Sequence, residues 1–194
     1  MYERQQKQIL LARINESRRF IQVVYGPRQV GKTTMITQLT TLSHYLELLS
    51  TAGLLSGIEK FNPATLRQRA SSPKFQVHNT ALLSAQVPES FRQVRSIPRE
   101  WGRWVESAVG AHLLNASRTE DFRLFYWRQG NREVDFVIEK AGKVIGLEVK
   151  SGAAGETSGM QAFRDKFSPQ KVFLVGNSGI PWPKFLTFSP SELF

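Results

Sequence analysis

The 194-residue chain contains no cysteine. Disulfide bonds, thiolate metal sites and cysteine nucleophiles are therefore excluded. It also lacks an apolar run long enough to cross a bilayer. The N-terminal stretch MYERQQKQ lacks the apolar centre of a signal peptide. These absences predict a cytoplasmic protein without a membrane partner.

Acidic residues are scarce relative to basic ones, with 16 Asp and Glu against 26 Lys and Arg, which gives a net charge of +10. Such an excess favours anionic partners, namely nucleotides, nucleic acid such as DNA, or acidic lipid. The alternative interpretation is a basic, well-solvated surface without a specific partner. Charge alone does not separate the two, and it leaves the oligomeric state open.

The stretch GPRQVGKTT, residues 26–34, fits the phosphate-binding pattern G-x-x-x-x-G-K-[ST]. An apolar strand is expected before it at 20–25, and one long helix is expected after it at 33–51. Glycines let several N–H groups point at one phosphate, Lys32 would reach the β- and γ-phosphates, and the Thr33 hydroxyl would bind Mg²⁺. The pattern predicts ATP and Mg²⁺ as cofactors, and the alternative is a glycine turn that happens to carry Lys-Thr. The nucleotide-binding residues would be Gly26, Pro27, Arg28, Gln29, Val30, Gly31, Lys32, Thr33 and Thr34.

ATP hydrolysis needs a second acidic metal ligand, usually at the end of an apolar strand. No run of four apolar residues followed by Asp or Glu occurs between Thr34 and the proline-containing connection expected at 86–100. We therefore expect nucleotide binding with poor hydrolysis.

The rest of the chain predicts alternating strands and helices. Strands are expected at 54–61 and 74–79, and a short helix capped by Thr80 is expected at 81–86. A helix at 99–117 is followed by strands at 122–127, 133–139 and 143–150, a helix at 159–167 and a strand at 171–176. This last series predicts an α/β domain.

A carboxylate-bearing hairpin lies within that domain. With Ala141-Gly142 as a two-residue turn, Asp135 would face Glu148 and Glu133 would face Lys150. Period-two alternation would place these four residues on one face. The opposite, core-facing side would carry Val134, Phe136, Ile138, Ile145, Leu147 and Val149.

Asp135, Glu148 and Lys150 form the pattern D-x12-E-x-K, which is typical of Mg²⁺-dependent nucleases. Asp135 and Glu148 would hold a metal that activates water, and Lys150 would steady the water or the developing phosphate charge. Glu106, on the preceding helix, is a further candidate ligand. The alternative is a surface charge ladder with a Glu133–Lys150 salt bridge. Trp101 and Trp104, on the same helix as Glu106, are interpreted as core residues.

Several stretches resemble the prokaryotic AAA-type ATPases that carry a C-terminal domain of unknown function related to the PD-(D/E)XK nucleases. They are YGPRQVGKTT, HYLELLSTAGLLSGIEKF, SSPKFQVHNTALLSA, WVESAVGAHLL, FYWRQGNREVDFVIEKAGKVIGLEVKSG and GIPWPKFL. The resemblance implies an α/β chain with a truncated P-loop segment at 1–42, a winged-helix-like segment and connection at 43–98, and a nuclease-like domain at 99–194. The strands at 54–61 and 74–79 would be the wing. The resemblance also implies a nuclease-like site of Glu106, Asp135, Glu148 and Lys150.

The chain departs from that family by an apparent internal deletion between Gln38 and Ser43, which removes the acidic metal strand, the sensor residues and the helical lid. The resemblance therefore implies an ATP-binding protein with poor hydrolysis and a nuclease-like C-terminal domain. A metal-dependent nuclease and a non-catalytic DNA-binding remnant are the alternatives.

Overall fold

The computed structural model describes residues 32–62, 72–152 and 157–194 of the chain. Within α2, the side chains of residues 32–41 are not described. The strand expected at 20–25 and the expected nucleotide-binding residues Gly26 to Gly31 lie outside the described residues.

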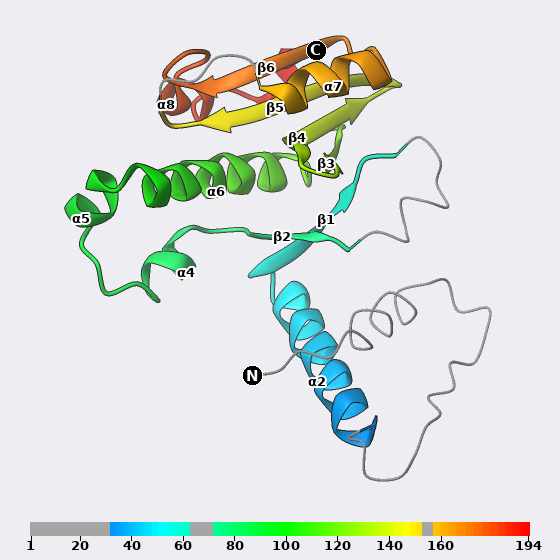
Figure 1. Ribbon diagram of the computed structural model, residues 1–194, viewed down its shortest axis with the longest axis vertical. Helices are drawn as coiled ribbons and strands as arrows, with labels where there is room; N and C mark the ends of the chain where they lie inside the picture. Colours follow the sequence, from blue (N-terminus) through cyan, green and yellow to red (C-terminus); the bar gives the residue numbers. More distant parts are fainter. Residues whose placement is uncertain (1–31, 63–71, 153–156) are drawn as a thin grey trace.

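The described elements are helices and strands mixed along the chain (Figure 1). In chain order they are α2 (Lys32–Thr51), β1 (Leu55–Lys60), β2 (Lys74–Val77), α4 (Ala81–Ser84), α5 (Phe91–Ser96), α6 (Pro98–Ala116), β3 (Arg123–Gln129), β4 (Arg132–Lys140), β5 (Lys143–Lys150), α7 (Ser158–Phe167), β6 (Lys171–Gly176), α8 (Trp182–Phe185) and the 3-10 helix Pro190–Leu193. The expected α/β composition is confirmed.

The strands form one six-stranded mixed sheet in the order β2-β1-β3-β4-β5-β6. The β3–β4 and β4–β5 neighbours are antiparallel, and β6 runs parallel to β5. The two strands expected as a wing pair antiparallel with each other, and β1 also pairs in parallel with β3 through Glu59↔Phe125 and Lys60↔Tyr126. The segment before residue 99 therefore extends the sheet of the C-terminal region.

Helices α6 and α7 pack on opposite faces of this sheet (Figure 1). On one face, Val105, Val109 and Leu113 of α6 join a buried cluster with side chains from β4 and β5 and with α8. On the other face, Phe163 of α7 packs with Trp127 of β3 and with a second set of β4 side chains. Burial of apolar area on both faces stabilises the two layers and fixes where the charged residues of β4 and β5 lie.

Helix α2 runs without a break from Lys32 to Thr51, as the sequence predicted for residues 33–51. After the helix, Gly53 has a φ of 69°, and the Gly53 and Leu54 N–H groups donate to Ser50 O and Leu49 O. This is a Schellman cap, which needs the left-handed backbone that glycine adopts readily. Leu42, Tyr45, Leu48 and Leu49 remain 40–59 % exposed, so their apolar side chains are only partly buried.

Two predictions are corrected, one about a connection and one about a helix cap. The connection expected at 86–100 contains α5, which begins with a capping box in which the Ser90 side chain accepts from Gln93 N–H and the Gln93 side chain accepts from Ser90 N–H. Thr80 precedes α4 but makes no side-chain cap; Asn79 Oδ1 accepts from Ala81 N–H instead. In both cases a neighbouring polar side chain satisfies the free helical N–H groups.

Candidate functional site

The hairpin turn is formed as predicted. Lys140 pairs with Lys143 across Ala141 and Gly142, whose φ values are 49° and 78°. Positive φ at both central residues is the signature of the turn that best matches strand twist. The predicted register holds from this turn to the pair Phe136↔Leu147.

The ladder ends before Asp135 and Glu148, so their expected direct pairing is not part of it. Val137 pairs with Phe125 and Val134 with Trp127, which leaves Asp135 and Phe136 opposite the single residue Tyr126. This is a β-bulge, and it reverses the side on which earlier residues of β4 point. Val134 consequently packs with Val137 and Phe163, and its predicted place beside Phe136 is wrong.

A lysine from β2 reaches this bulge. The Gln76 amide donates to Ser107 O at 3.0 Å, and a side chain at Gly110 of α6 would collide with Gln76. The absence of a Cβ there lets β2 lie close against α6. Lys74 lies two residues before Gln76 and therefore on the same face of β2, next to Glu106.

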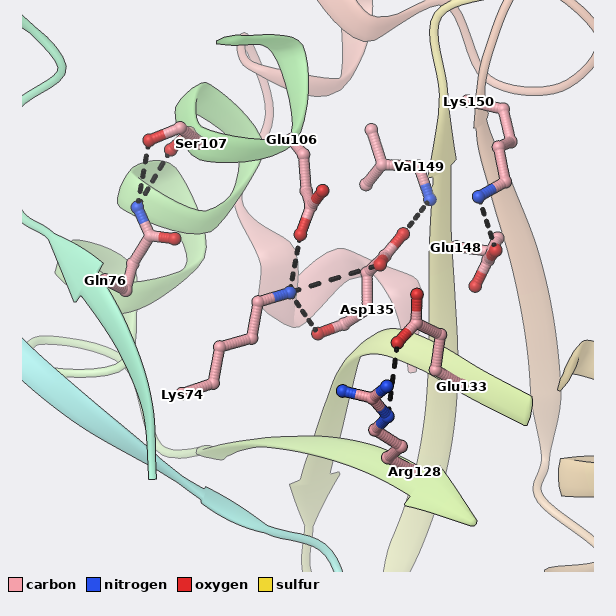
Figure 2. Close-up of polar contacts among 10 residues, drawn as sticks. All are labelled: Lys74, Gln76, Glu106, Ser107, Arg128, Glu133, Asp135, Glu148, Val149 and Lys150. Atoms are coloured by element: carbon pink, nitrogen blue, oxygen red, sulfur yellow. Dashed lines mark hydrogen bonds and ion pairs between the residues drawn. The ribbon is translucent and has the colours of Figure 1, made fainter. Parts of the chain in front are cut away.

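The Lys74 ammonium lies between Glu106 and Asp135 (Figure 2). Its Nζ donates to Glu106 Oε1 at 2.6 Å and to the Asp135 backbone oxygen at 3.4 Å, and it is 4.0 Å from Asp135 Oδ1. It also lies 4.7 Å from the centre of the Phe136 ring, within range of a cation–π contact. The structure thus brings Glu106 and Asp135 together through a lysine that sequence analysis did not assign to the site.

The Asp135 carboxylate is almost completely buried, with 7 % of the residue exposed. Its Oδ2 accepts a hydrogen bond from the Val149 backbone N–H at 2.8 Å. The side chain therefore links β4 to β5 beyond the last backbone pair of their ladder. Burial raises the pKa of Asp135 to about 7, and the charges of Glu148 and Glu106 contribute, while Lys74 opposes the rise.

Glu148 and Lys150 form a second pair on β5. Lys150 Nζ lies 2.9 Å from Glu148 Oε1. Burial raises the pKa of Glu148, and the hydrogen bond from Lys150 partly offsets this. Although partial burial works against it, the hydrogen bond and charge of Glu148 raise the pKa of Lys150, with Asp135 and Glu106 adding to the rise.

The four charged residues do not share an open face, contrary to prediction. Asp135 and Glu148 are both buried, and Figure 2 shows the Glu148–Lys150 pair and the Asp135 carboxylate on either side of β5. The expected Glu133–Lys150 surface salt bridge is not the pairing observed either. Glu133 instead lies 3.9 Å from Arg128.

A cavity of about 400 Å³ opens beside this arrangement. Lys74, Glu106 and Asp135 line it together with Tyr126, Arg128 and Glu133. The Arg128 side chain is 62 % exposed and the Lys150 side chain is 39 % exposed, so both cations reach solvent. The wall of the cavity thus carries charges of both signs among apolar side chains such as Trp127 and Val134.

Trp101 and Trp104 border a different cavity of about 290 Å³, which also involves Trp182. Trp101 packs against the α6-side core and meets Trp182 edge-on at 5.8 Å. Both tryptophans are half-buried. Trp101 packs against the core, so the interpretation of the two as core residues is confirmed in part.

The carboxylates predicted to hold a metal at the nuclease-like site do not fit Mg²⁺ as they are arranged. Across residues 32–62, 72–152 and 157–194, no three Asp, Glu or His side chains converge in a way that would hold a metal ion. Lys74 lies between Glu106 and Asp135, and Glu148 is engaged by Lys150. Thr33, predicted to bind the Mg²⁺ of ATP, lies in α2, and its side chain is outside the described part of the structure.

Residues 101–186 match the family described as "Domain of unknown function (DUF4143)". The match includes Glu106, Asp135, Glu148 and Lys150, and it excludes Lys74. No curated protein and no solved structure matches the chain. Among the described helices, none is both long and apolar enough to cross a membrane.

In the sequence, Lys74 belongs to the strand expected as part of a wing at 74–79, and so it lies outside the predicted site. One signal was present. Lys74 and Gln76 alternate with Phe75 and Val77, and in the structure Gln76 is buried whereas Phe75 is 48 % exposed. A strand whose polar residues face inward indicates a polar partner on the facing element, here Glu106 and Ser107 of α6.

Proposed function

We propose that the chain binds the phosphodiester backbone of DNA through a nuclease-like site, without metal-assisted cleavage. The site consists of Lys74, Glu106, Asp135, Glu148 and Lys150, which we call the carboxylate–lysine cluster, and the neighbouring Arg128. The observation that carries the proposal is the gathering of these charges where pairing between β4 and β5 stops, beside a cavity with charges of both signs on its wall. The order helix–Glu, strand–Asp and strand–Glu-x-Lys supports a relationship to PD-(D/E)XK nucleases.

The cations of the site suit phosphate recognition. Lys150 and Arg128 are partly exposed and hold their acidic partners at 2.9 and 3.9 Å, so a phosphate would compete with those carboxylates for N–H donors. Phosphate contacts release condensed counterions, and binding therefore weakens steeply with salt. The net charge of +10 supports the same partner.

DNA binding can be measured by fluorescence anisotropy with a labelled duplex, using Lys150→Gln and Arg128→Gln as the test variants. Lys143→Gln and Arg123→Gln, at the turn end of the same strands, are matched controls because both are exposed. Each test variant should weaken binding several-fold and reduce the salt slope by about one, whereas the controls should change little. Equal weakening by both sets would show that binding follows overall charge and would contradict the proposal.

A second candidate function is nucleotide binding by residues 26–34. The supporting observation is that Lys32 and the residues after it are helical, as the phosphate-binding pattern requires. The first turn of a helix has free N–H groups that favour phosphate. β1 and β2, which follow α2, contain one acidic residue, the exposed Glu59, so they supply no acidic strand end for Mg²⁺.

We therefore propose weak Mg²⁺–ATP binding through Gly31, Lys32 and Thr33 with little turnover. Titration with a fluorescent ATP analogue should give a signal that Lys32→Ala abolishes. Turnover near 1 s⁻¹, in the ordinary enzyme range, would contradict the second half of this proposal. Unchanged affinity in Lys32→Ala would contradict the first half.

A further inference from the structure

We infer that Lys74 takes the place of a divalent cation in the carboxylate–lysine cluster and keeps such a cation out. The inference rests on the proposed nuclease-like site and explains why that site would bind DNA without cleaving it. Lys74 comes from β2, which lies before the family match at 101–186.

The position of the ammonium is the first argument. Nζ is 2.6 Å from Glu106 Oε1 and 4.0 Å from Asp135 Oδ1, so it bridges carboxylates from α6 and β4. Mg²⁺ would need oxygen ligands at about 2.1 Å in octahedral geometry. A metal held by these two carboxylates would have to displace the ammonium, because two cations that close repel strongly.

The anchoring of Lys74 is the second argument. The Gln76–Ser107 hydrogen bond and the close approach at Gly110 fix β2 against α6. The ammonium also contacts the face of Phe136 and the Asp135 backbone oxygen. The side chain is 29 % exposed, so displacing it would break several contacts and leave a half-buried ammonium without its partners.

Charge balance is the third argument. The cluster contains three carboxylates and two ammonium groups. When all five are ionised, its net charge is one negative charge. Without Lys74 the cluster would carry two net negative charges, which one divalent cation would neutralise.

The inference can be tested by titrating the full chain with Mn²⁺ in the absence of nucleotide, and by counting free Mn²⁺ by electron paramagnetic resonance. The unmodified chain should show no stoichiometric site. Lys74→Met, which keeps the chain length and removes the charge, should bind one Mn²⁺ at least tenfold more tightly. The double variant Lys74→Met/Asp135→Asn should lose that site, and the control Lys143→Met should behave like the unmodified chain.

Thermal unfolding provides a second readout, because a ligand that binds only the folded state raises Tm. Mn²⁺ should raise the Tm of Lys74→Met and leave that of the unmodified chain unchanged. Lys74→Gln serves as a second variant should Lys74→Met not fold. The inference is overturned if the unmodified chain binds Mn²⁺ as tightly as the variant, or if folded Lys74→Met and Lys74→Gln bind none.

The unmodified chain is informative by itself, since stoichiometric Mn²⁺ binding to it that Asp135→Asn abolishes would also overturn the inference. Failure of the proposed function has a different signature. Loss of site-specific DNA binding would appear in the anisotropy experiment while the Mn²⁺ results could still follow the pattern expected for Lys74.

Discussion

The two ends of the β4–β5 hairpin differ although they are built from the same two strands. At the turn end, pairing is regular from Lys140↔Lys143 to Phe136↔Leu147, and charged side chains such as Lys143 are exposed. At the open end, pairing between β4 and β5 stops and β4 contains a β-bulge. The carboxylates of Asp135 and Glu148 are buried there.

The difference separates the part of the hairpin that stabilises the fold from the part that forms the candidate site. A regular antiparallel ladder satisfies backbone groups and buries apolar side chains. At the open end a side chain has taken over part of that role, since Asp135 accepts the Val149 N–H. Buried charges are costly unless they are paired, and here Lys74 and Lys150 provide the pairing. Such an arrangement is more easily explained by function than by stability.

The largest expected effect concerns the packing of the open end. A Cβ at Gly159, near the start of α7, would lie 2.0 Å from the Glu133 backbone oxygen. Gly159→Ala must therefore push α7 away from β4, and it should lower the free energy of unfolding by about 3 kcal/mol or more. Gly152→Ala is the control, because nothing lies within 4 Å of a Cβ there. Urea denaturation measures both, and equal losses would contradict the close contact.

The next effect concerns the pH dependence of the open end. The pKa of Asp135 is about 7 in the folded protein and lower in the unfolded chain, where the carboxyl group is solvated. The folded state therefore binds the proton more tightly, and Asp135 makes stability fall as pH rises from about 4 to 7. Above that window the cost is constant.

Asp135→Asn cannot ionise and should flatten this dependence. Relative to the unmodified chain, the variant should gain on the order of 2–4 kcal/mol in unfolding free energy between pH 5 and pH 8. Chemical denaturation at a series of pH values gives the difference curve, in which the titration of Glu148 and other common groups largely cancels. A difference curve that is flat, or that slopes the other way, would show that Asp135 is ionised throughout.

A smaller effect is expected at the turn. Gly142 has a φ of 78°, and nothing lies within 4 Å of a Cβ built there. Gly142→Ala should thus cost only the strain of a left-handed alanine, about 1 kcal/mol. Gly142→Asn should cost less, because asparagine tolerates this conformation. Thermal unfolding distinguishes the two variants, and a loss as large as that of Gly159→Ala would remove the contrast between the ends.

The smallest effect concerns surface charge near the turn. Arg123 lies 2.6 Å from Glu139, but its side chain is 69 % exposed. Exposed ion pairs contribute little, and Arg123→Ala should change the free energy of unfolding by less than about 1 kcal/mol. A larger loss, measured by urea denaturation, would mean that charges at the turn end matter as much as those at the open end.

The regular end of the hairpin was predictable from sequence because local chemistry determines it. The dipeptide Ala141-Gly142 sets the turn, and period-two alternation sets the register. The uninterrupted helical pattern likewise predicted α2 across Gln38 and Ser43. In each case the responsible residues are neighbours in the chain.

The open end was not predictable in the same way because distant segments determine it. The bulge at Asp135 depends on how β3 pairs with β4, and alternation along one strand cannot reveal it. Lys74 reaches Asp135 only because β2 packs against α6 and β1 joins β3 in the sheet. The types and spacing of Glu106, Asp135, Glu148 and Lys150 identified the candidate site, whereas the cation between Glu106 and Asp135 required the three-dimensional arrangement.

The central claim is that the open end binds DNA through protein cations and without a divalent metal. The most direct test is to measure duplex binding by anisotropy, and strand breakage of supercoiled plasmid by gel electrophoresis, each in Mg²⁺ and in EDTA at equal ionic strength. We expect equal affinity in the two conditions and no breakage in either. Binding that requires Mg²⁺, or Mg²⁺-dependent nicking that Asp135→Asn abolishes, would contradict the account.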